Sequence, residues 1–205
     1  MKVLINFYAS VSEQSVNDLI NFITQQIAIS LKNKDNPLDE IIIQISSSGG
    51  SSDHGLLAYN YLKQLNVKKT TIGMGNVDSA AVMIFLAGDE RLAMSSCRFV
   101  LHEALTTIEK GVFNDTKLHE IANLNKRITR DYCSVISSVT GKSVKSVQGK
   151  VKNGKVMSSN DAIDYGLVLR ILNTPYLVTL DGLNILMVNN PSLLGQSGNR
   201  SVVEN

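Results

Sequence analysis

The chain has 205 residues, of which 43% are hydrophobic and 19% are charged. These values predict one globular domain with a full hydrophobic core, and they exclude an intrinsically disordered chain. The net charge of +2 is too small to indicate a partner made of nucleic acid or a membrane surface. No apolar run is long enough to span a bilayer. Two isolated cysteines, Cys97 and Cys133, indicate a reducing compartment, so we expect a cytoplasmic protein.

The first half of the chain alternates predicted strands with predicted helices. The run at 41–45 is rich in β-branched residues and reads as a buried strand. Alternation of this kind predicts an α/β fold with a mostly parallel sheet covered by helices. Strands are expected at 3–8, 41–45, 69–74 and 97–101, and helices are expected after the N-cap Ser12, after the turn at 46–52, and at 79–86.

The second half is dominated by one long predicted helix at 115–139. Apolar residues recur along one stripe of it, and Gly141 suits its C-terminal stop. A short helix is expected to begin at the capping-box-like 158–161 and to end at Gly166. A hairpin is expected at 176–188. We place the single domain at 1–188 and expect 189–205, rich in Asn, Ser and Gly, to be a disordered tail.

Three features that could carry chemistry follow successive predicted strands. Gly49 and Gly50 permit a sharp turn that exposes backbone amides, and Ser79 stands where a strand meets an apolar helix. His102 follows the strand at 97–101 and could act as a general base toward Ser79. Each feature alone has a plainer interpretation, since the glycines suit an ordinary turn and Ser79 or Asp78 suits a helix cap. Their combination favours a serine nucleophile, a histidine base, and a Gly-Gly turn whose amides could face a developing oxyanion.

These motifs resemble those of the proteolytic subunit of the ATP-dependent Clp protease. Ile45-Ser-Ser-Ser-Gly-Gly50 is similar to that family's Ser-Pro-Gly-Gly motif, and Asp78-Ser-Ala-Ala81 with Phe85-Leu-Ala-Gly88 is similar to its nucleophile segment. Arg98-Phe-Val-Leu-His102 and the segment from Met157-Ser158 to Tyr165-Gly-Leu167 resemble two further family motifs in the same order.

The resemblance implies a Clp/crotonase-like spiral of strand-strand-helix units. The helix at 115–139 would then be the handle that joins two rings face to face, which implies a homo-oligomer of stacked rings. Ser79 would be the nucleophile, His102 the base, and the amides of Gly50 and Ala80 the oxyanion hole. The implied substrate is a peptide or an unfolded protein, and no metal or cofactor is implied.

The chain departs from the family pattern at several positions. The segment 149–155 contains no acid where the family has its catalytic aspartate, and Asn153 is the nearby side chain that could orient an imidazole. Ser48 replaces the proline of the Gly-Gly motif, and Thr106 and Thr107 replace a glycine pair that helps bind substrate. The family's axial N-terminal segment is not seen before the first strand, which leaves an unfoldase ATPase partner open.

Three functions follow from these observations. We expect a serine endopeptidase with weak activity, because a neutral amide at Asn153 can orient the histidine ring without stabilising its charge. The missing acid favours the alternative of a non-catalytic Clp-fold subunit that only assembles. A crotonase-type enzyme acting on acyl-coenzyme A is a further alternative, since that family shares the fold, but the pairing of Ser79 with His102 favours the peptidase.

Overall fold

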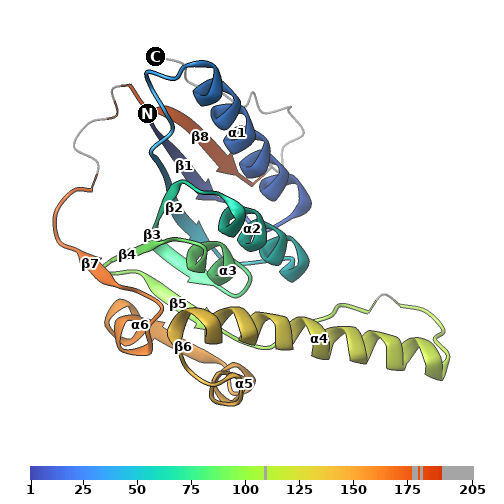
Figure 1. Cartoon of the computed structure of the whole chain (residues 1–205). Coiled ribbons are helices and arrows are strands. Elements are labelled where there is room, and N and C mark those ends of the chain that lie inside the picture. Colours follow the sequence, from blue (N-terminus) through green and yellow to red (C-terminus); the bar gives the residue numbers. More distant parts are fainter. Residues whose placement is uncertain (109, 177–179, 181, 191–205) are drawn as a thin grey trace.

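The computed structural model describes residues 1–108, 110–176, 180 and 182–190. Its strands form one sheet in the order β6-β5-β3-β2-β1-β8, and β4 pairs with both β3 and β7 (Figure 1). Every strand pair is parallel except β5 with β6. The strands are β1 (Lys2–Tyr8), β2 (Glu40–Ser47), β3 (Lys68–Asp78), β4 (Glu90–Met94), β5 (Arg98–Leu101), β6 (Lys155–Ser158), β7 (Arg170–Leu172) and β8 (Asn184–Asn189).

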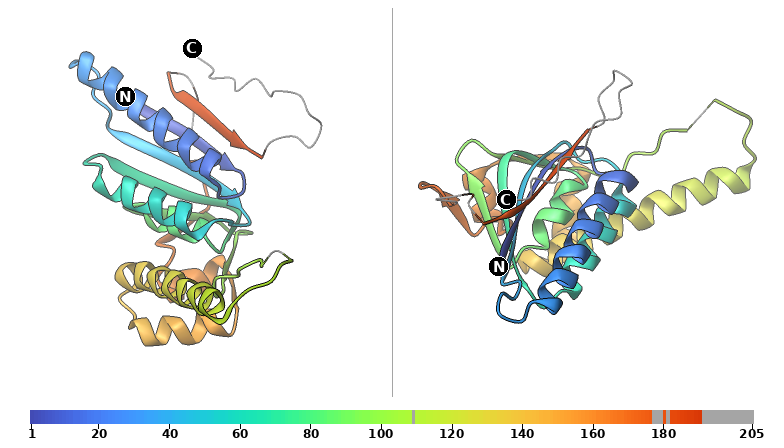
Figure 2. Two further views of the ribbon diagram at one scale, coloured as in Figure 1. Left: turned by 90° about the vertical axis from the view of Figure 1, so that its right-hand side faces the viewer. Right: turned by 90° about the horizontal axis from the view of Figure 1, so that it is seen from above.

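Helices α1, α2 and α3 lie side by side on one face of this sheet (Figures 1 and 2). The α/β architecture and the long helix expected from the sequence are therefore confirmed. The helices are α1 (Glu13–Lys32), α2 (Ser52–Gln64), α3 (Ala81–Leu86), α4 (Asp115–Thr140), α5 (Val144–Lys152) and α6 (Ser159–Tyr165).

The predicted helix boundaries hold where the sequence carries capping chemistry. The side chain of Ser12 accepts a hydrogen bond from the amide of Ser15 at the start of α1. Ser158 and Asp161 form a complete capping box at the start of α6. Gly141 and Gly166 end α4 and α6 with φ of 71° and 92°, in the left-handed region that glycine adopts without a Cβ clash.

Both faces of the central strands are buried. Ile41, Ile43 and Ile45 of β2 pack into the main core under the helices, whereas Ile42 packs into a smaller cluster on the opposite face with Ile72. Successive side chains of a strand point to opposite faces, so a sheet covered on both sides requires a continuous apolar run. Within the described residues, no helix is both long enough and apolar enough to cross a bilayer.

Several elements differ from the expectation. The structure adds β4, β6 and β7, which are only three to five residues long, and the helix α5. The hairpin expected at 176–188 lies partly outside the described residues; its described strand, β8, pairs in parallel with β1, from Val3 with Asn184 to Tyr8 with Asn189. Residues 177–179 and 181 of that region, and 191–205 of the expected disordered tail, lie outside the described residues.

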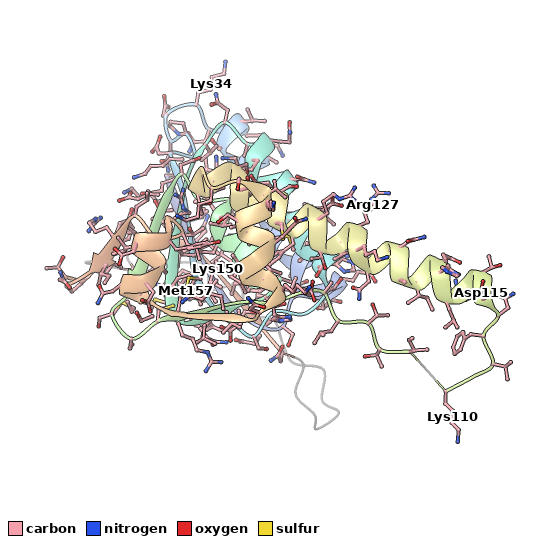
Figure 3. All side chains as sticks on the ribbon, turned by 90° about the horizontal axis from the view of Figure 1, so that it is seen from below. Lys34, Lys110, Asp115, Arg127, Lys150 and Met157 are labelled. Carbon is pink, nitrogen blue, oxygen red and sulfur yellow. The ribbon has the colours of Figure 1, made fainter. Side chains whose placement is uncertain are left out.

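The N-terminal part of α4 projects away from the body of the molecule (Figure 2). Lys110 and Asp115 lie at the far end of this projection, and Arg127 lies nearer the sheet (Figure 3). The C-terminal part of α4 packs on the core through Tyr132, Cys133, Val135 and Ile136, which are buried. The apolar stripe predicted along this helix is thus covered at one end and exposed at the other.

A buried carboxylate ties the N-terminal ends of β1, β2 and β3 together. Glu40 has a side chain that is 3% exposed, and it accepts hydrogen bonds from Thr70 at 2.6 Å and Tyr176 at 2.8 Å. The ammonium groups of Lys2 and Lys68 lie 2.8 and 3.2 Å from its two oxygens. Burial alone would raise the pKa of Glu40, but these hydrogen bonds outweigh it and lower the pKa to about 2.

We expect Glu40→Gln to lower the free energy of unfolding at pH 7 by about 3 kcal/mol. The pKa of Glu40 is depressed in the folded state, so its contribution is present above the unfolded pKa. It is lost as the pH falls from about 4.5 toward 2. Urea unfolding of the wild type and the variant between pH 7 and pH 3 measures this difference. Plotted against pH, the two free energies of unfolding should converge at low pH. Glu120→Gln, which removes an exposed ion pair with Lys117, is the control and should change little. If the difference in unfolding free energy between the wild type and Glu40→Gln does not become smaller as the pH falls, the depressed pKa of Glu40 is contradicted.

Candidate active site

The ends of β2, β3 and β5 meet at one edge of the sheet. Neighbouring parallel strands share this edge, so the residues that follow them, Gly49-Gly50, Ser79 and His102, are brought together. The amide of Ser79 donates to the carbonyl of Val100 at 2.8 Å, which fixes the residue after β3 against β5. Ser79, Ala80 and His102 line one small hollow together with Ser52 and Tyr132.

Ser79 occupies a strained turn between β3 and α3. Its φ of 54° is left-handed, and among the described residues it is the non-glycine residue with a positive φ. This conformation costs about 1–2 kcal/mol for a residue with a Cβ. The capping interpretation is wrong, because Ala80 is the N-cap of α3 and no side chain caps that helix. A strained serine on a sharp strand-to-helix turn is the arrangement that exposes a nucleophilic hydroxyl.

Gly49 and Gly50 let the loop after β2 approach the turn at Ser79. A Cβ at Gly49 would lie 2.7 Å from the Ser79 Cβ and 3.1 Å from the Ala80 nitrogen. A Cβ at Gly50 would collide with the carbonyl oxygen of Val11. The amides of Gly50 and Ala80 have no hydrogen-bond acceptor within the described residues. Two free amides beside a serine are the donors that an oxyanion requires.

An ion pair next to Ser79 holds β3 and β5 together. Asp78 Oδ2 accepts hydrogen bonds from Arg98 Nη2 at 2.9 Å, from Arg98 Nε at 3.3 Å and from Asn76 Nδ2 at 3.1 Å. This pairing raises the pKa of the Arg98 guanidinium. The sequence pattern suggested Asp78 only as a helix cap, whereas the structure shows it positioning the strand end that carries Ser79.

The imidazole of His102 is oriented by a main-chain group. Its Nδ1 lies 2.7 Å from the carbonyl oxygen of Glu103. A carbonyl oxygen only accepts hydrogen bonds, so Nδ1 carries the proton and Nε2 is left as the basic nitrogen. No hydrogen bond joins Ser79 and His102 within the described residues, although both residues line the same hollow.

The structure gives Asn153 no contact with His102. Asn153 is the exposed C-cap of α5, and within the described residues its side chain makes no hydrogen bond. The antiparallel ladder of β5 and β6 ends with the pair of Leu101 and Lys155, and the residues that come next after this pair on the two segments are His102 and Gly154. Gly154 has a φ of 66°, and a Cβ there would meet nothing within 4 Å. Gly154, at the end of this ladder, thus has room for a side chain and lacks one. Sequence reasoning missed it because it did not predict β6, whose register identifies the position.

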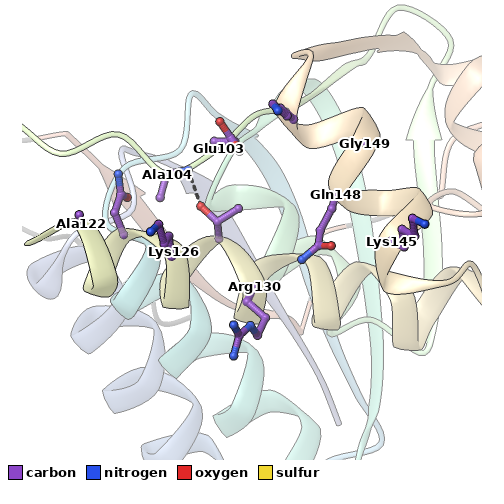
Figure 4. A pocket seen from close by; sticks show the side chains of 11 residues that line it. Glu103, Ala104, Ala122, Lys126, Arg130, Lys145, Gln148 and Gly149 are labelled. Atoms are coloured by element: carbon purple, nitrogen blue, oxygen red, sulfur yellow. Dashed lines mark hydrogen bonds between the residues drawn. The ribbon is translucent and has the colours of Figure 1, made fainter. Parts of the chain in front are cut away.

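A larger cavity of about 680 Å³ lies between α4 and α5, outside the hollow that holds Ser79. Figure 4 shows Lys126 and Arg130 of α4 and Lys145 of α5 around it. The amide of Ala104 donates to Thr129 Oγ1 at 3.2 Å along its wall. Neither Ser79 nor His102 lines this cavity, so we do not place the candidate active site in it. Within the described residues, no group of three or more His, Cys, Asp or Glu side chains could hold a metal ion.

Comparisons with known proteins agree with this geometry. A family model described as Clp protease matches residues 2–175. The ATP-dependent Clp protease proteolytic subunit 2 of Borreliella burgdorferi is 30% identical over 138 residues, which cover 66% of this chain and 68% of that protein. The protein of the same description from Pseudomonas aeruginosa is 26% identical over 175 residues, which cover 84% and 82% of the two chains.

A solved structure shows the same fold. The structure of a ClpP1 mutant from Listeria monocytogenes superposes with a TM-score of 0.71 at 23% identity, covering 84% of this chain and 91% of that chain. The family match and this superposition confirm the predicted Clp-like fold.

Proposed function

This chain belongs to the Clp protease family, and we propose that it is a serine-type endopeptidase that hydrolyses peptide bonds through an acyl-enzyme on Ser79. The observation that carries the proposal is the left-handed φ of Ser79 at the end of β3. The residue is not a helix cap, and it lines one hollow with His102. A strained serine with no capping role, placed beside a histidine, supports a nucleophile.

The proposed reaction has two stages. Ser79 Oγ bonds to the carbonyl carbon of the scissile peptide as its proton passes to His102 Nε2, and the amides of Gly50 and Ala80 bind the oxyanion. The C–N bond then breaks, and His102 returns the proton to the leaving amine. A water molecule gives a proton to His102 and attacks the acyl-enzyme. Release of the peptide acid returns the proton to Ser79.

The carbonyl of Glu103 takes part of the role that a carboxylate has in a complete triad. It accepts a hydrogen bond from the Nδ1–H group of His102 and fixes the tautomer, but it brings no negative charge to stabilise the imidazolium. We therefore expect slow turnover. Within the described residues, no carboxylate is hydrogen-bonded to His102, and no hydrogen bond joins Ser79 to His102. Both absences favour one alternative, a non-catalytic assembly subunit.

Covalent labelling tests the proposal. A fluorophosphonate probe reacts with a serine only when a base and an oxyanion hole activate it, so the peptide containing Ser79 should carry the phosphonate in mass spectrometry. A crotonase-type use of the amides of Gly50 and Ala80 would leave Ser79 unlabelled, as would the non-catalytic role. An unlabelled Ser79 after prolonged incubation therefore overturns the peptidase.

We also propose that the chain assembles into a homo-oligomer through the projecting part of α4. Large apolar side chains there and in the preceding segment are exposed to solvent, more than a monomer surface requires. They are Leu105 at 86%, Ile108 at 49%, Val112 at 104%, Leu118 at 45% and Leu124 at 54%. Stacked rings joined by this helix are the arrangement that the family implies.

We expect Leu118→Glu combined with Leu124→Glu to dissociate the oligomer at micromolar concentration. The added carboxylates would have to be buried unpaired in the interface, which is costly. Sedimentation velocity measures the change in mass, and circular dichroism checks that the fold survives. Leu31→Glu on α1, at a side chain that is 74% exposed, is the control and should leave assembly intact. A wild-type chain that sediments only as a monomer would refute the proposal.

A further inference from the structure

The cavity of about 680 Å³ between α4 and α5 is strongly basic. Its charged lining residues are one acid, Glu103, and four cations, Lys126, Arg130, Lys145 and Lys152. These residues give the lining a net charge of +3, which exceeds the +2 of the whole chain. A cavity whose walls carry mainly one sign of charge attracts ligands of the opposite sign. We call it the basic cavity.

The four cations of the basic cavity have no carboxylate partner. None of them forms an ion pair within the part of the chain that the structure describes, and all four are exposed. Two other cations of α4 are paired, because Lys117 lies 3.1 Å from Glu120 and Arg127 lies 3.8 Å from Asp131. The cations of the cavity are therefore available to the carboxylates of a ligand, with which they form charge-assisted hydrogen bonds.

Small residues keep the basic cavity open. Ala104, Ala122 and Gly149 line it, and a Cβ at Gly149 would meet nothing within 4 Å. Figure 4 shows α4 and α5 on two sides of the cavity and Glu103 with Ala104 on a third. Its volume falls within the range of about 300–1,000 Å³ that is usual for ligand pockets.

An unpaired acceptor in the lining indicates what kind of anion fits. Asn125 lines the basic cavity, and its buried Oδ1 accepts no hydrogen bond within the described residues. A buried acceptor left unpaired costs free energy, which a ligand with a hydrogen-bond donor would recover. An inorganic phosphate chain offers the cations its oxygens but has little to donate at neutral pH. An acidic peptide offers carboxylates to the cations and backbone N–H groups to Asn125.

The basic cavity adjoins the hollow that holds Ser79. Ala104 lines both spaces. The carbonyl of Glu103 accepts the hydrogen bond from His102 Nδ1 at 2.7 Å, and the amide of Ala104 donates to Thr129 Oγ1 at 3.2 Å. The segment that orients the histidine thus also forms a wall of the cavity. A polypeptide bound at Ser79 can reach the cavity within a few residues, since an extended residue spans about 3.3–3.6 Å.

We propose that the basic cavity binds acidic residues of the polypeptide substrate, a few positions away from the bond that Ser79 cleaves. This inference rests on the proposed peptidase function and specifies its substrate class, chains with acidic segments. Substrate carboxylates pair with the four cations, and a substrate N–H group donates to Asn125 Oδ1. A basic segment is repelled by the same cations.

Fluorogenic peptides that differ in one pair of residues test the selection. One peptide carries Asp-Asp and the other Asn-Asn, which has nearly the same shape without the charge. The pair is placed about two to six residues from the scissile bond, on either side in turn. At the best placement, the assembled protein should show a kcat/KM for the Asp peptide at least fivefold above that for the Asn peptide. This ratio should fall toward one in about 0.5 M salt, which screens exposed charges.

Charge reversal in the cavity should remove the preference. Lys126→Glu combined with Lys145→Glu should bring the ratio of the two kcat/KM values to one or below. Lys150→Glu is the matched control, because Lys150 is exposed on α5 and does not line the cavity; its ratio should match the wild type. Circular dichroism and sedimentation check that each variant folds and assembles. If the double variant does neither, Lys152→Gln is the milder substitution and should still lower the ratio.

Binding separates this inference from the proposed function. Fluorescence anisotropy of the two peptides on Ser79→Ala protein measures recognition without turnover. Tighter binding of the Asp peptide, lost when Lys126→Glu and Lys145→Glu are added, supports the basic cavity even if the wild type hydrolyses nothing. Hydrolysis of both peptides at equal rates and with equal affinities overturns the selection and leaves the peptidase standing.

Two other occupants of the cavity would also overturn the proposal. If tripolyphosphate binds the wild type, and the Asp peptide does not displace it, the cavity is a site for small anions. If the Asp and Asn peptides bind equally, and Lys126→Glu with Lys145→Glu dissociates the oligomer, a second copy of the chain covers the cavity.

Discussion

Replacing Ser79 with alanine is expected to abolish fluorophosphonate labelling and to lower peptide hydrolysis by at least about 10³-fold. The hydroxyl forms the covalent bond in the proposed reaction, so no other group replaces it. The substitution should not unfold the protein, because Ser79 caps no helix and its side chain makes no hydrogen bond within the described residues. Labelling, initial rates with a fluorogenic peptide, and thermal unfolding together measure the outcome.

Ser96→Ala is the matched control for this experiment. Ser96 is exposed, lies in the turn between β4 and β5, and does not line the catalytic hollow. Its loss should leave both labelling and hydrolysis at the wild-type level. Labelling that persists in Ser79→Ala would show that another serine reacts, and the assignment of the nucleophile would then be wrong.

Adding a carboxylate near His102 is expected to raise activity. His102 and Gly154 come directly after the last pair of the β5–β6 ladder, Leu101 with Lys155, so we expect a side chain at position 154 to lie near His102. Aspartate tolerates the left-handed φ of this position, and its Cβ would meet nothing within 4 Å. Gly154→Asp should raise kcat at least tenfold, because loss of the charge in a complete triad costs roughly 10⁴-fold.

Two variants isolate the effect of the charge at this position. Gly154→Asn brings the same backbone strain and a similar side chain without the charge, so it should raise kcat far less. Asn153→Asp brings the charge one residue out of register, and it should have little effect. The kcat of each of the three variants for a fluorogenic peptide is compared with that of the wild type, from stopped-flow or steady-state rates. A Gly154→Asp protein that is folded and no faster than Gly154→Asn would contradict the role assigned to this position.

The sequence was sufficient to predict the elements with strong local signals. Ser12, Gly141 and Gly166 mark helix ends through chemistry that acts within a few residues, and the run at 41–45 marks a strand that is buried on both faces. The short strands β4, β6 and β7 have no such signal, because their conformation is set by pairing with distant segments. The parallel pairing of β8 with β1 was not predicted for the same reason, since the two strands come from opposite ends of the described chain.

The candidate site also combines residues that the sequence predicts with residues whose position depends on distant pairing. Ser79, His102, Gly50 and Ala80 each follow a strand end in the sequence, and the topology of the sheet brings those ends together. The position near His102 depends instead on the register of an antiparallel pair that was not predicted. Asn153 was therefore chosen on residue type, whereas the ladder points to its neighbour Gly154.

The pairing of β8 with β1 determines which backbone groups are exposed at this edge of the sheet. Without β8, the first strand would present a row of unpaired amide and carbonyl groups to any passing chain, and such edges template aggregation. With β8 in place, β1 is hydrogen-bonded on both sides, and the exposed edge belongs to a strand of six residues instead. The residues of β8 lie beyond residue 175, where the family match ends. β8 thereby covers the amide and carbonyl groups of β1 that would otherwise form the edge of the sheet.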